Sequence, residues 1–262
     1  FHIDGDAYVQ ERVLGNTRTS STYLVRDGDG KQHVVKQLKE KVPFGFDLVK
    51  KNESVEKFQR EARVLGKLQH PQIPKLEKCF AAEPGGETNF YMLMEYCEGS
   101  TLEEVVGKPM EPKQAVEIML SLCKPIEYCH SRTPTVKHRD IKPANIIFNG
   151  EAKLVDFGIV LDEESGTRGR NTISGTPGYM APEQWWGKAE ERSDIYGMGT
   201  TLLHMLTGVS PNQMLDEASS DPGKKFHVQY ASHVQHLDER LRQILDKCLA
   251  FEPEQRYGCV AE

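Results

Sequence analysis

Residues 137–158 read KHRDIKPANIIFNGEAKLVDFG, and the rest of the chain is interpreted around them. Two short β-type runs flank Asn149-Gly150, a dipeptide that favours a hairpin because both residues tolerate positive φ. Polar side chains come just before the first strand and just after the second, at the same end of this hairpin. Oxygen-bearing side chains gathered at one point are the ligands that Mg²⁺ prefers, together with the phosphates of a substrate. The residues concerned are Asp140, Asn145 and Asp156.

The spacing of the polar residues in this stretch matches the protein-kinase signature. His138-Arg139-Asp140 is followed by Lys142 and Asn145, and Asp156-Phe157-Gly158 closes the stretch. Asp-Phe-Gly alone is a frequent tripeptide, but the joint pattern is far less common. The chain therefore resembles a protein kinase.

Composition and charge are those of an ordinary globular chain. The 262 residues carry a net charge of −6, which gives no electrostatic case for nucleic-acid binding. No apolar run approaches the roughly 20 residues that a membrane span needs, so this segment is expected to make no membrane contact. The six cysteines lack metal-ligand spacing. They indicate reduced thiols and a cytoplasmic location.

The ends of the chain predict a domain excised from a longer protein. The sequence starts at Phe1 and stops at Glu262, within what reads as a helix. The parent protein could therefore be membrane-anchored outside this segment. Nothing in the sequence decides between a monomer and a dimer.

The resemblance implies an α+β, two-lobed fold in a single kinase domain, residues 1–262. A small antiparallel β lobe with one main helix is expected at 1–95. A larger, mainly helical lobe is expected at 96–262, truncated near its last helix. The sequence pattern predicts strands at 8–15, 22–27, 32–38, 73–81 and 89–95, and helices at 54–68, 112–132, 193–208 and 237–249. Asn52 or Ser54 is expected to cap the first of these helices, and Ser193 or Asp194 the third.

Several residues match the positions at which the family binds ATP. Lys36 matches the strand lysine that pairs with the α and β phosphates, and Glu61 matches the helix glutamate that pairs with this lysine. In the loop that covers the phosphates only Gly15 of the usual glycines is present; Thr17 and Ser20 occupy the other positions, which predicts a slim but stiffer loop. The resemblance places the remaining contacts at Val34, Leu102 and Ile147 around adenine, and at the hinge backbone of Glu95 and Cys97.

The resemblance also assigns the chemistry. Asp140 would orient the substrate hydroxyl and accept its proton, and Lys142 and Lys36 would neutralise charge on the transferring phosphoryl group. Asn145 and Asp156 would hold Mg²⁺, or Mn²⁺, on the phosphates of ATP. Positioning of the reactants and electrostatic stabilisation would then supply most of the rate enhancement.

Two features favour serine and threonine hydroxyls of protein substrates. Lys142, two residues after Asp140, is the residue that serine/threonine kinases carry. Gly175-Thr176-Pro177 fits their substrate-binding loop, in which Thr176 would bond both Asp140 and Lys142. The last motif of the family supplies an arginine for the glutamate of Ala181-Pro182-Glu183, and here it predicts a pair between Arg256 and Glu183. The resemblance also implies that Asp194 bonds the backbone around His138 and Arg139.

Regulation is predicted in the segment after Asp156. Thr172 lies four residues before Thr176, the spacing at which such kinases take an activating phosphate. A phosphate there could pair with Arg139 and order the segment. Ser174 and Thr167 are rival sites.

Two other functions compete with a serine/threonine kinase that phosphorylates its own activation loop. A pseudokinase, acting as a nucleotide-binding or scaffolding module, is suggested by the altered glycine loop. Against it, the five polar residues that the family uses for catalysis are all present: Lys36, Glu61, Asp140, Asn145 and Asp156. A small-molecule phosphotransferase is opposed by the Glu183 and Arg256 motifs. The run 175–184 looks most like bacterial kinases of the eukaryotic type.

Overall fold

The computed structural model describes residues 2–3, 6–39, 42–43, 53–82, 87–157, 175–216, 218–220 and 225–262. The chain divides into two compact units, Phe1–Cys97 and Glu98–Glu262, and the division falls two residues after the one expected from the sequence. The first unit is mainly β-sheet with one long helix, whereas the second is mainly helical. The predicted α+β class is confirmed.

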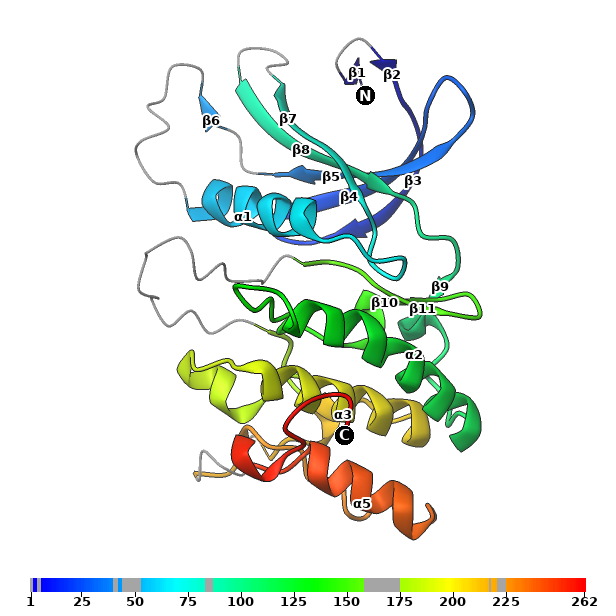
Figure 1. Ribbon diagram of the computed structural model, residues 1–262, viewed down its shortest axis with the longest axis vertical. Helices are drawn as coiled ribbons and strands as arrows, with labels where there is room; N and C mark the ends of the chain where they lie inside the picture. The colour runs from blue at the N-terminus through cyan, green and yellow to red at the C-terminus, as the bar shows by residue number, and fades with distance from the viewer. Residues whose placement is uncertain are drawn as a thin grey trace. The chain divides into compact units, whose positions relative to one another are not determined.

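An antiparallel sheet forms most of the first unit (Figure 1). Its strand order is β3-β4-β5-β8-β6, and β7 also pairs with β8. A small separate pair, β1 and β2, precedes it. The strands are β1 His2–Ile3, β2 Asp6–Ala7, β3 Val9–Asn16, β4 Ser20–Arg26, β5 Gln32–Leu38, β6 Val42–Pro43, β7 Leu76–Ala82 and β8 Glu87–Glu95.

The predicted strands agree with the observed ones except at their ends. The strand predicted at 32–38 coincides with β5. In contrast, β7 begins at Leu76, three residues later than predicted. The preceding residues form a turn in which the Ile73 N–H donates to the His70 carbonyl at 3.0 Å. Pro71 and Pro74 have no N–H to give to a strand ladder, so this part of the chain cannot pair.

Helix α1, Glu53–Lys67, packs on the sheet of its own unit through contacts with β7 and β5 (Figure 1). Its apolar residues recur at helical spacing, so they share one face. Ser54 lies inside the first turn and is not the cap that the sequence suggested; the alternative, Asn52, lies outside the described residues. The buried residues of this face are Val55, Phe58, Ala62 and Leu65.

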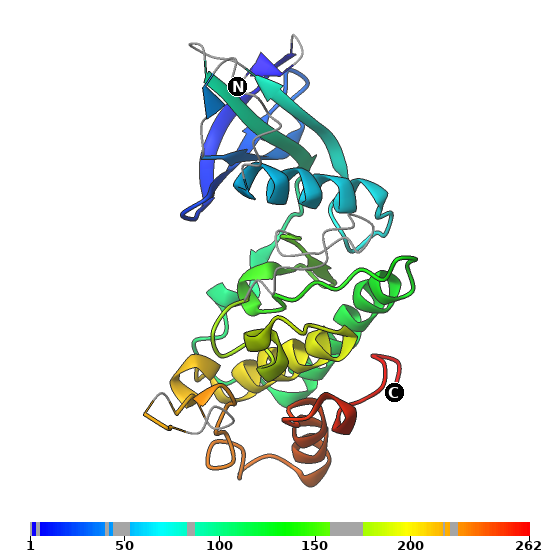
Figure 2. The same ribbon diagram turned by 90° about the vertical axis from the view of Figure 1, so that its left-hand side faces the viewer.

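Three helices dominate the second unit, and Figure 2 shows α2 and α3 side by side. Helix α3, Glu191–Thr207, is buried on every side from Ser193 to Leu206, which makes it the centre of this core. Helices α2, Pro112–His130, and α5, Glu239–Cys248, both pack against it. The described part of this unit also contains the short 3-10 turns η2 Leu102–Glu104, η3 Pro143–Asn145, η5 Pro182–Trp186, η6 Pro211–Met214 and η7 Pro253–Gln255.

The predicted start of α3 needs a correction. The sequence suggested that Ser193 or Asp194 caps this helix, but the N-cap residue is Glu190. The Ser193 hydroxyl oxygen instead accepts the Glu190 N–H at 3.0 Å from within the first turn. Asp194 is thereby left to bond a different part of the chain.

The predicted hairpin is present as β10, Ile146–Phe148, and β11, Ala152–Leu154, with β9, Ser100–Thr101, on its outer side. Phe148 pairs with Ala152, so three residues form the loop. Among them Gly150 has a positive φ of 77°. Within the described residues, no helix is long and apolar enough to span a membrane.

Replacement of Gly208 by alanine should destabilise the second unit. Gly208 ends α3 with φ 67°, and a Cβ built on it would lie 2.7 Å from the backbone nitrogen of Pro109. Left-handed strain and this backbone clash should lower the free energy of unfolding by about 1–3 kcal/mol. Both tryptophans lie in the second unit, so urea unfolding followed by tryptophan fluorescence reports on it.

The matched control is Gly107→Ala. Nothing lies within 4 Å of a Cβ built on Gly107, so this change should alter the stability by no more than about 0.5 kcal/mol. Equal unfolding midpoints for the two variants would contradict the expectation.

Candidate active site

Asp140 and Asn145 form one buried unit at the start of the hairpin. Turn η3 brings the Asn145 side chain back over Asp140, and its Nδ2 donates to the Asp140 carbonyl at 2.8 Å and to Oδ2 at 3.1 Å. The two residues are 6% and 5% exposed. Because one amide holds both the backbone and the carboxylate of Asp140, the direction of this carboxylate is fixed.

Lys142 and Thr176 complete the surroundings of the Asp140 carboxylate. The Thr176 hydroxyl donates to Asp140 Oδ1 at 2.7 Å. The Lys142 ammonium lies 2.7 Å from Oδ2 and donates to Thr176 Oγ1 at 2.6 Å. Both contacts predicted for Thr176 are therefore present. The carboxylate thus has a hydroxyl at one oxygen and a positive charge at the other.

Asp156 follows β11 in a left-handed conformation, with φ 62°. The N–H of its neighbour Val155 donates to the Asn145 carbonyl at 2.9 Å, which joins the two ends of the hairpin. Phe157, 1% exposed, anchors the chain edge-on against the His138 ring at 4.9 Å. The Asp156 side chain itself is exposed.

The side-chain oxygen atoms of Asn145 and Asp156 suit a hard cation that also binds the oxygen atoms of substrate phosphates. Asn145 supplies an amide oxygen and Asp156 an exposed carboxylate. Among the described residues, no group of three or more acidic, histidine or cysteine side chains could hold a metal by itself. One or two protein ligands completed by substrate phosphates is the arrangement that Mg²⁺ commonly has in proteins.

The backbone before Asp140 is held by a carboxylate from α3. Asp194 Oδ2 accepts the His138 N–H at 2.9 Å, and Oδ1 accepts the Arg139 N–H at 2.7 Å. The His130 ring Nε2 lies 2.8 Å from Oδ2. Burial acts to raise the pKa of Asp194, but these hydrogen bonds, the one from His130 first, outweigh it and lower the pKa. The anchoring contact that the resemblance implied for Asp194 is present.

Arg139 is the residue predicted to receive a regulatory phosphate. It has φ 67°, an uncommon conformation for a residue with a side chain. Its predicted partner Thr172, and the rivals Ser174 and Thr167, lie outside the described residues. The regulatory role of this pair stays a prediction.

The lysine predicted to pair with the ATP phosphates, Lys36, and its predicted partner Glu61 both lie in the first unit. Lys36 of β5 donates to Glu61 of α1 at 2.6 Å, and the side chains are 11% and 5% exposed. The predicted pair is therefore present and nearly buried. Removing one partner of such a pair leaves an uncompensated charge, so β5 and α1 are strongly tied at this point.

The loop between β3 and β4 is narrow and closed by its own side chains. The Thr17 N–H donates to the Ser20 carbonyl at 2.9 Å, and Thr17 Oγ1 accepts the Ser20 N–H at 3.0 Å. Asn16 and Ser21 bond each other at 3.0 Å. Gly15 is not required by its conformation, because a Cβ there would meet only Thr22 at 3.9 Å. The loop is thus bonded internally, and its predicted stiffness stays a prediction.

The residues predicted to surround adenine differ in exposure. Val34, paired with Met94, and Ile147, paired with Thr101, are half-buried, so part of each side chain can meet a ligand. Leu102 is 1% exposed and belongs to the core of the second unit, which argues against a contact with adenine. The hinge residues Glu95, half-buried, and Cys97, 3% exposed, lie at the end of the first unit.

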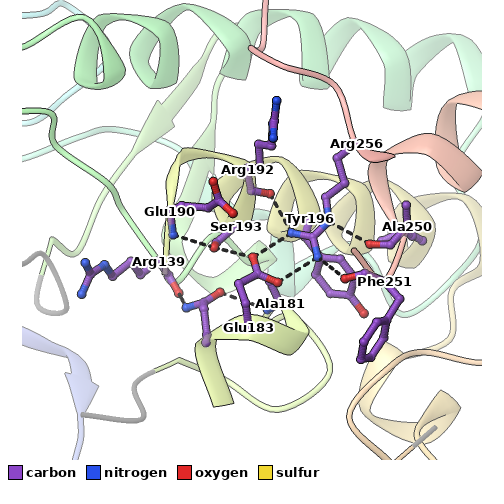
Figure 3. A network of polar contacts seen from close by, with 12 residues as sticks. Arg139, Ala181, Glu183, Glu190, Arg192, Ser193, Tyr196, Ala250, Phe251 and Arg256 are labelled. Carbon is purple, nitrogen blue, oxygen red and sulfur yellow. Dashed lines mark hydrogen bonds and ion pairs between the residues drawn. The ribbon is translucent and has the colours of Figure 1, made fainter. Parts of the chain in front are cut away.

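A buried ion pair fixes the segment that follows Thr176. Arg256 donates to both carboxylate oxygens of Glu183, at 2.7 and 2.8 Å, and the Ser193 hydroxyl donates to Glu183 Oε1 at 2.5 Å (Figure 3). The Arg256 side chain is fully buried. Its remaining donors reach the carbonyls of Ala250, Phe251 and Arg192.

Comparison with known proteins decides the family. The model of the protein kinase domain matches residues 8–261. The chain belongs to the protein kinase family.

Several curated relatives of this kinase domain come from bacteria. It is 33% identical to serine/threonine-protein kinase D of Synechocystis over 97% of this chain and 50% of that protein. It is 32% identical to serine/threonine-protein kinase PknA of Nostoc over 96% of this chain and 45% of that protein. It is 35% identical to serine/threonine-protein kinase PrkC of Bacillus subtilis over 76% of this chain and 30% of that protein. The chain thus spans half or less of the length of these relatives.

Two residues of this kinase domain were missed by the sequence analysis. His130 contacts Asp194 across 64 positions of sequence, and a histidine in the last turn of a helix carries no local sign of such a partner. Gln184 donates to the Arg139 carbonyl at 2.9 Å across 45 positions. Its only sequence signal was its place directly after Glu183.

Replacement of Arg256 by methionine should strongly destabilise the second unit. The change keeps an apolar stem but leaves the Glu183 carboxylate buried without its cation. Breaking a buried pair in this way costs about 3–5 kcal/mol. Urea unfolding of the second unit, followed by tryptophan fluorescence, measures the loss.

Arg242→Met is the matched control, because Arg242 pairs with Glu239 on the surface of α5 at 2.6 Å with side chains 40% and 66% exposed. Exposed pairs contribute about 0–1 kcal/mol. The expectation fails if both variants lose the same small amount of stability.

Proposed function

We propose that this chain is a serine/threonine protein kinase that transfers the γ-phosphoryl group of ATP to hydroxyl groups of protein substrates. The observation that carries the proposal is the set of contacts around Asp140, whose carboxylate meets a hydroxyl at Oδ1 and the Lys142 ammonium at Oδ2. Thr176 presents a threonine hydroxyl at the atom where a substrate serine or threonine would have to bind. The names of the bacterial relatives support the same amino-acid class.

The roles of the residues follow from this geometry. A new bond forms between the substrate oxygen and the γ-phosphorus, the β–γ bridging bond breaks, and ADP leaves. Asp140 orients the substrate hydroxyl and takes its proton at the carboxylate. Lys142 supplies positive charge beside the acceptor, and Asn145 keeps the Asp140 carboxylate from rotating.

ATP and Mg²⁺ belong to the same proposal. Asn145 and Asp156 fit a cation shared with phosphates, and Lys36, held by Glu61, fits the phosphates themselves. When bound, Mg²⁺, or Mn²⁺ in its place, would neutralise the negative charge that develops on the phosphates. Val34, Ile147 and the hinge backbone of Glu95 and Cys97 would receive the adenine.

The pseudokinase alternative is not favoured. It was suggested by the absence of glycine at positions 17 and 20, yet hydrogen bonds between Thr17 and Ser20 close the loop. The Lys36–Glu61 pair and the Asp140–Asn145 unit are also intact. Cytoplasmic location and autophosphorylation at Thr172 stay predictions, and the oligomeric state stays open.

Phosphate transfer tests the proposal directly. With labelled ATP and Mg²⁺, the purified chain should label itself or a general protein substrate on serine and threonine and not on tyrosine. Asp140→Asn should lower the rate by about 10²–10⁴-fold, the usual contribution of a positioned acid or base. Acid hydrolysis and separation of the phosphoamino acids identify the acceptor.

The same substitution at Asp29, an exposed residue in the turn between β4 and β5, serves as the control and should leave the rate unchanged. Chain that binds ATP but transfers no label with Mg²⁺ or Mn²⁺ would make the pseudokinase interpretation the correct one.

A further inference from the structure

The peptide before the catalytic aspartate is held on both sides by buried side chains. Arg139 has φ 67°, a left-handed conformation that is strained for a residue with a side chain. Its N–H donates to Asp194 Oδ1 at 2.7 Å, and its carbonyl accepts Gln184 Nε2 at 2.9 Å. A strained conformation persists when its surroundings over-determine it. The support from Asp194 was expected, whereas the support from Gln184 was not.

Gln184 is built into the fold as a bridge. It is 2% exposed and lies in turn η5, where its Oε1 accepts the Ala181 N–H at 3.0 Å. A backbone N–H can only donate and a carbonyl can only accept, so these two partners determine which end of the amide points to which. Both hydrogen bonds are therefore made by a neutral amide in this orientation, whereas a carboxylate could make only the one to the Ala181 N–H.

The bridge is the second point at which the acceptor-binding segment, which starts at Thr176, is joined to the catalytic turn, which contains Arg139 and Asp140. The first point is the Thr176 hydroxyl on Asp140. The Thr176 carbonyl accepts the N–H groups of Tyr179 and Met180, both at 3.0 Å, so the chain from Thr176 to η5 is a closed turn. Glu183, next to Gln184, is locked by Arg256. Gln184 thus belongs to a segment that is held by backbone hydrogen bonds and a buried ion pair.

We propose that Gln184 is a positioning residue for the phosphoryl-transfer reaction. Its amide holds the Arg139 carbonyl, and through it the direction of the Asp140 carboxylate, relative to the segment that receives the acceptor hydroxyl. The inference rests on the proposed kinase function. It assigns to Gln184 an effect on the rate of transfer and none on the binding of ATP.

Gln184→Glu separates the two hydrogen bonds. The introduced carboxylate can still accept the Ala181 N–H but cannot donate to the Arg139 carbonyl, and it faces that carbonyl oxygen with like charge. Loss of this support should lower kcat about 10–10²-fold at pH 8.5, because a displacement of about 1 Å at a reacting group costs up to about 10²-fold. KM for ATP should not change.

The pH dependence supplies the decisive measurement. A buried carboxyl group has a raised pKa, and once protonated it can again donate to the Arg139 carbonyl. The ratio of kcat for Gln184→Glu to kcat for the unchanged chain should therefore rise as the pH falls from 8.5 to 6. Gln184→Met has a similar shape but neither hydrogen bond, so its ratio should stay low and flat.

Gln229→Glu is the matched control. Gln229 also donates from Nε2 to a backbone carbonyl, that of His227 at 3.1 Å, but it is exposed. Its kcat should follow that of the unchanged chain at every pH. Thermal unfolding of each variant accompanies the kinetics.

A second, uncharged variant keeps the inference testable if Gln184→Glu does not fold. Gln184→Asn retains the amide but is one methylene too short to reach both partners, and it should lower kcat with KM for ATP unchanged.

A pH-independent ratio for Gln184→Glu, or unchanged kcat in both variants, would overturn the positioning role while leaving the kinase function intact. Absence of transfer by the unchanged chain would instead overturn the proposed function, and the inference with it.

Discussion

The buried carboxylate of Asp194 is the constraint on which the catalytic part of this kinase depends. Its side chain is fully buried, and it accepts hydrogen bonds from two consecutive backbone N–H groups and lies 2.8 Å from the His130 ring. Burial alone would favour the neutral acid, but these donors lower its pKa, so the charge is retained in the core. The charge in turn holds Arg139 in a left-handed conformation that the chain would otherwise avoid.

The acceptor side depends on a second buried charge that lies far away in the sequence. Glu183 and Arg256 are 73 positions apart, and neither would be stable in the core without the other. Their pairing ties η5 to the region after α5 and supplies the fixed point from which Thr176 reaches Asp140. Asp194 lies in the first turn of α3, and Glu183 accepts a hydrogen bond from Ser193 in the same turn, so both anchors meet at the start of this buried helix.

Local rules predicted the elements well, because periodicity and proline positions act within a few residues. The strand at 32–38 and the apolar face of α1 follow from such patterns. The motif spacing also identified the residues around Asp140, since those side chains lie within one short segment. The cap of α3 was misassigned because Ser193 bonds Glu190 and Glu183 at once, a choice that tertiary contacts make. His130 and Gln184 were missed for the same reason: their partners are brought to them only by folding.

A neutral amide at position 184 is a physically reasonable choice for the second support of the turn. The carbonyl of Arg139 needs a donor, which a carboxylate at ordinary pH cannot supply. A lysine or arginine could donate to this carbonyl but could not accept the Ala181 N–H, because neither side chain has an acceptor atom. The amide satisfies the carbonyl and the Ala181 N–H together and adds no charge beside the two aspartates. Asp194 therefore holds the Arg139 N–H with a charged group, and Gln184 holds the Arg139 carbonyl with an uncharged one.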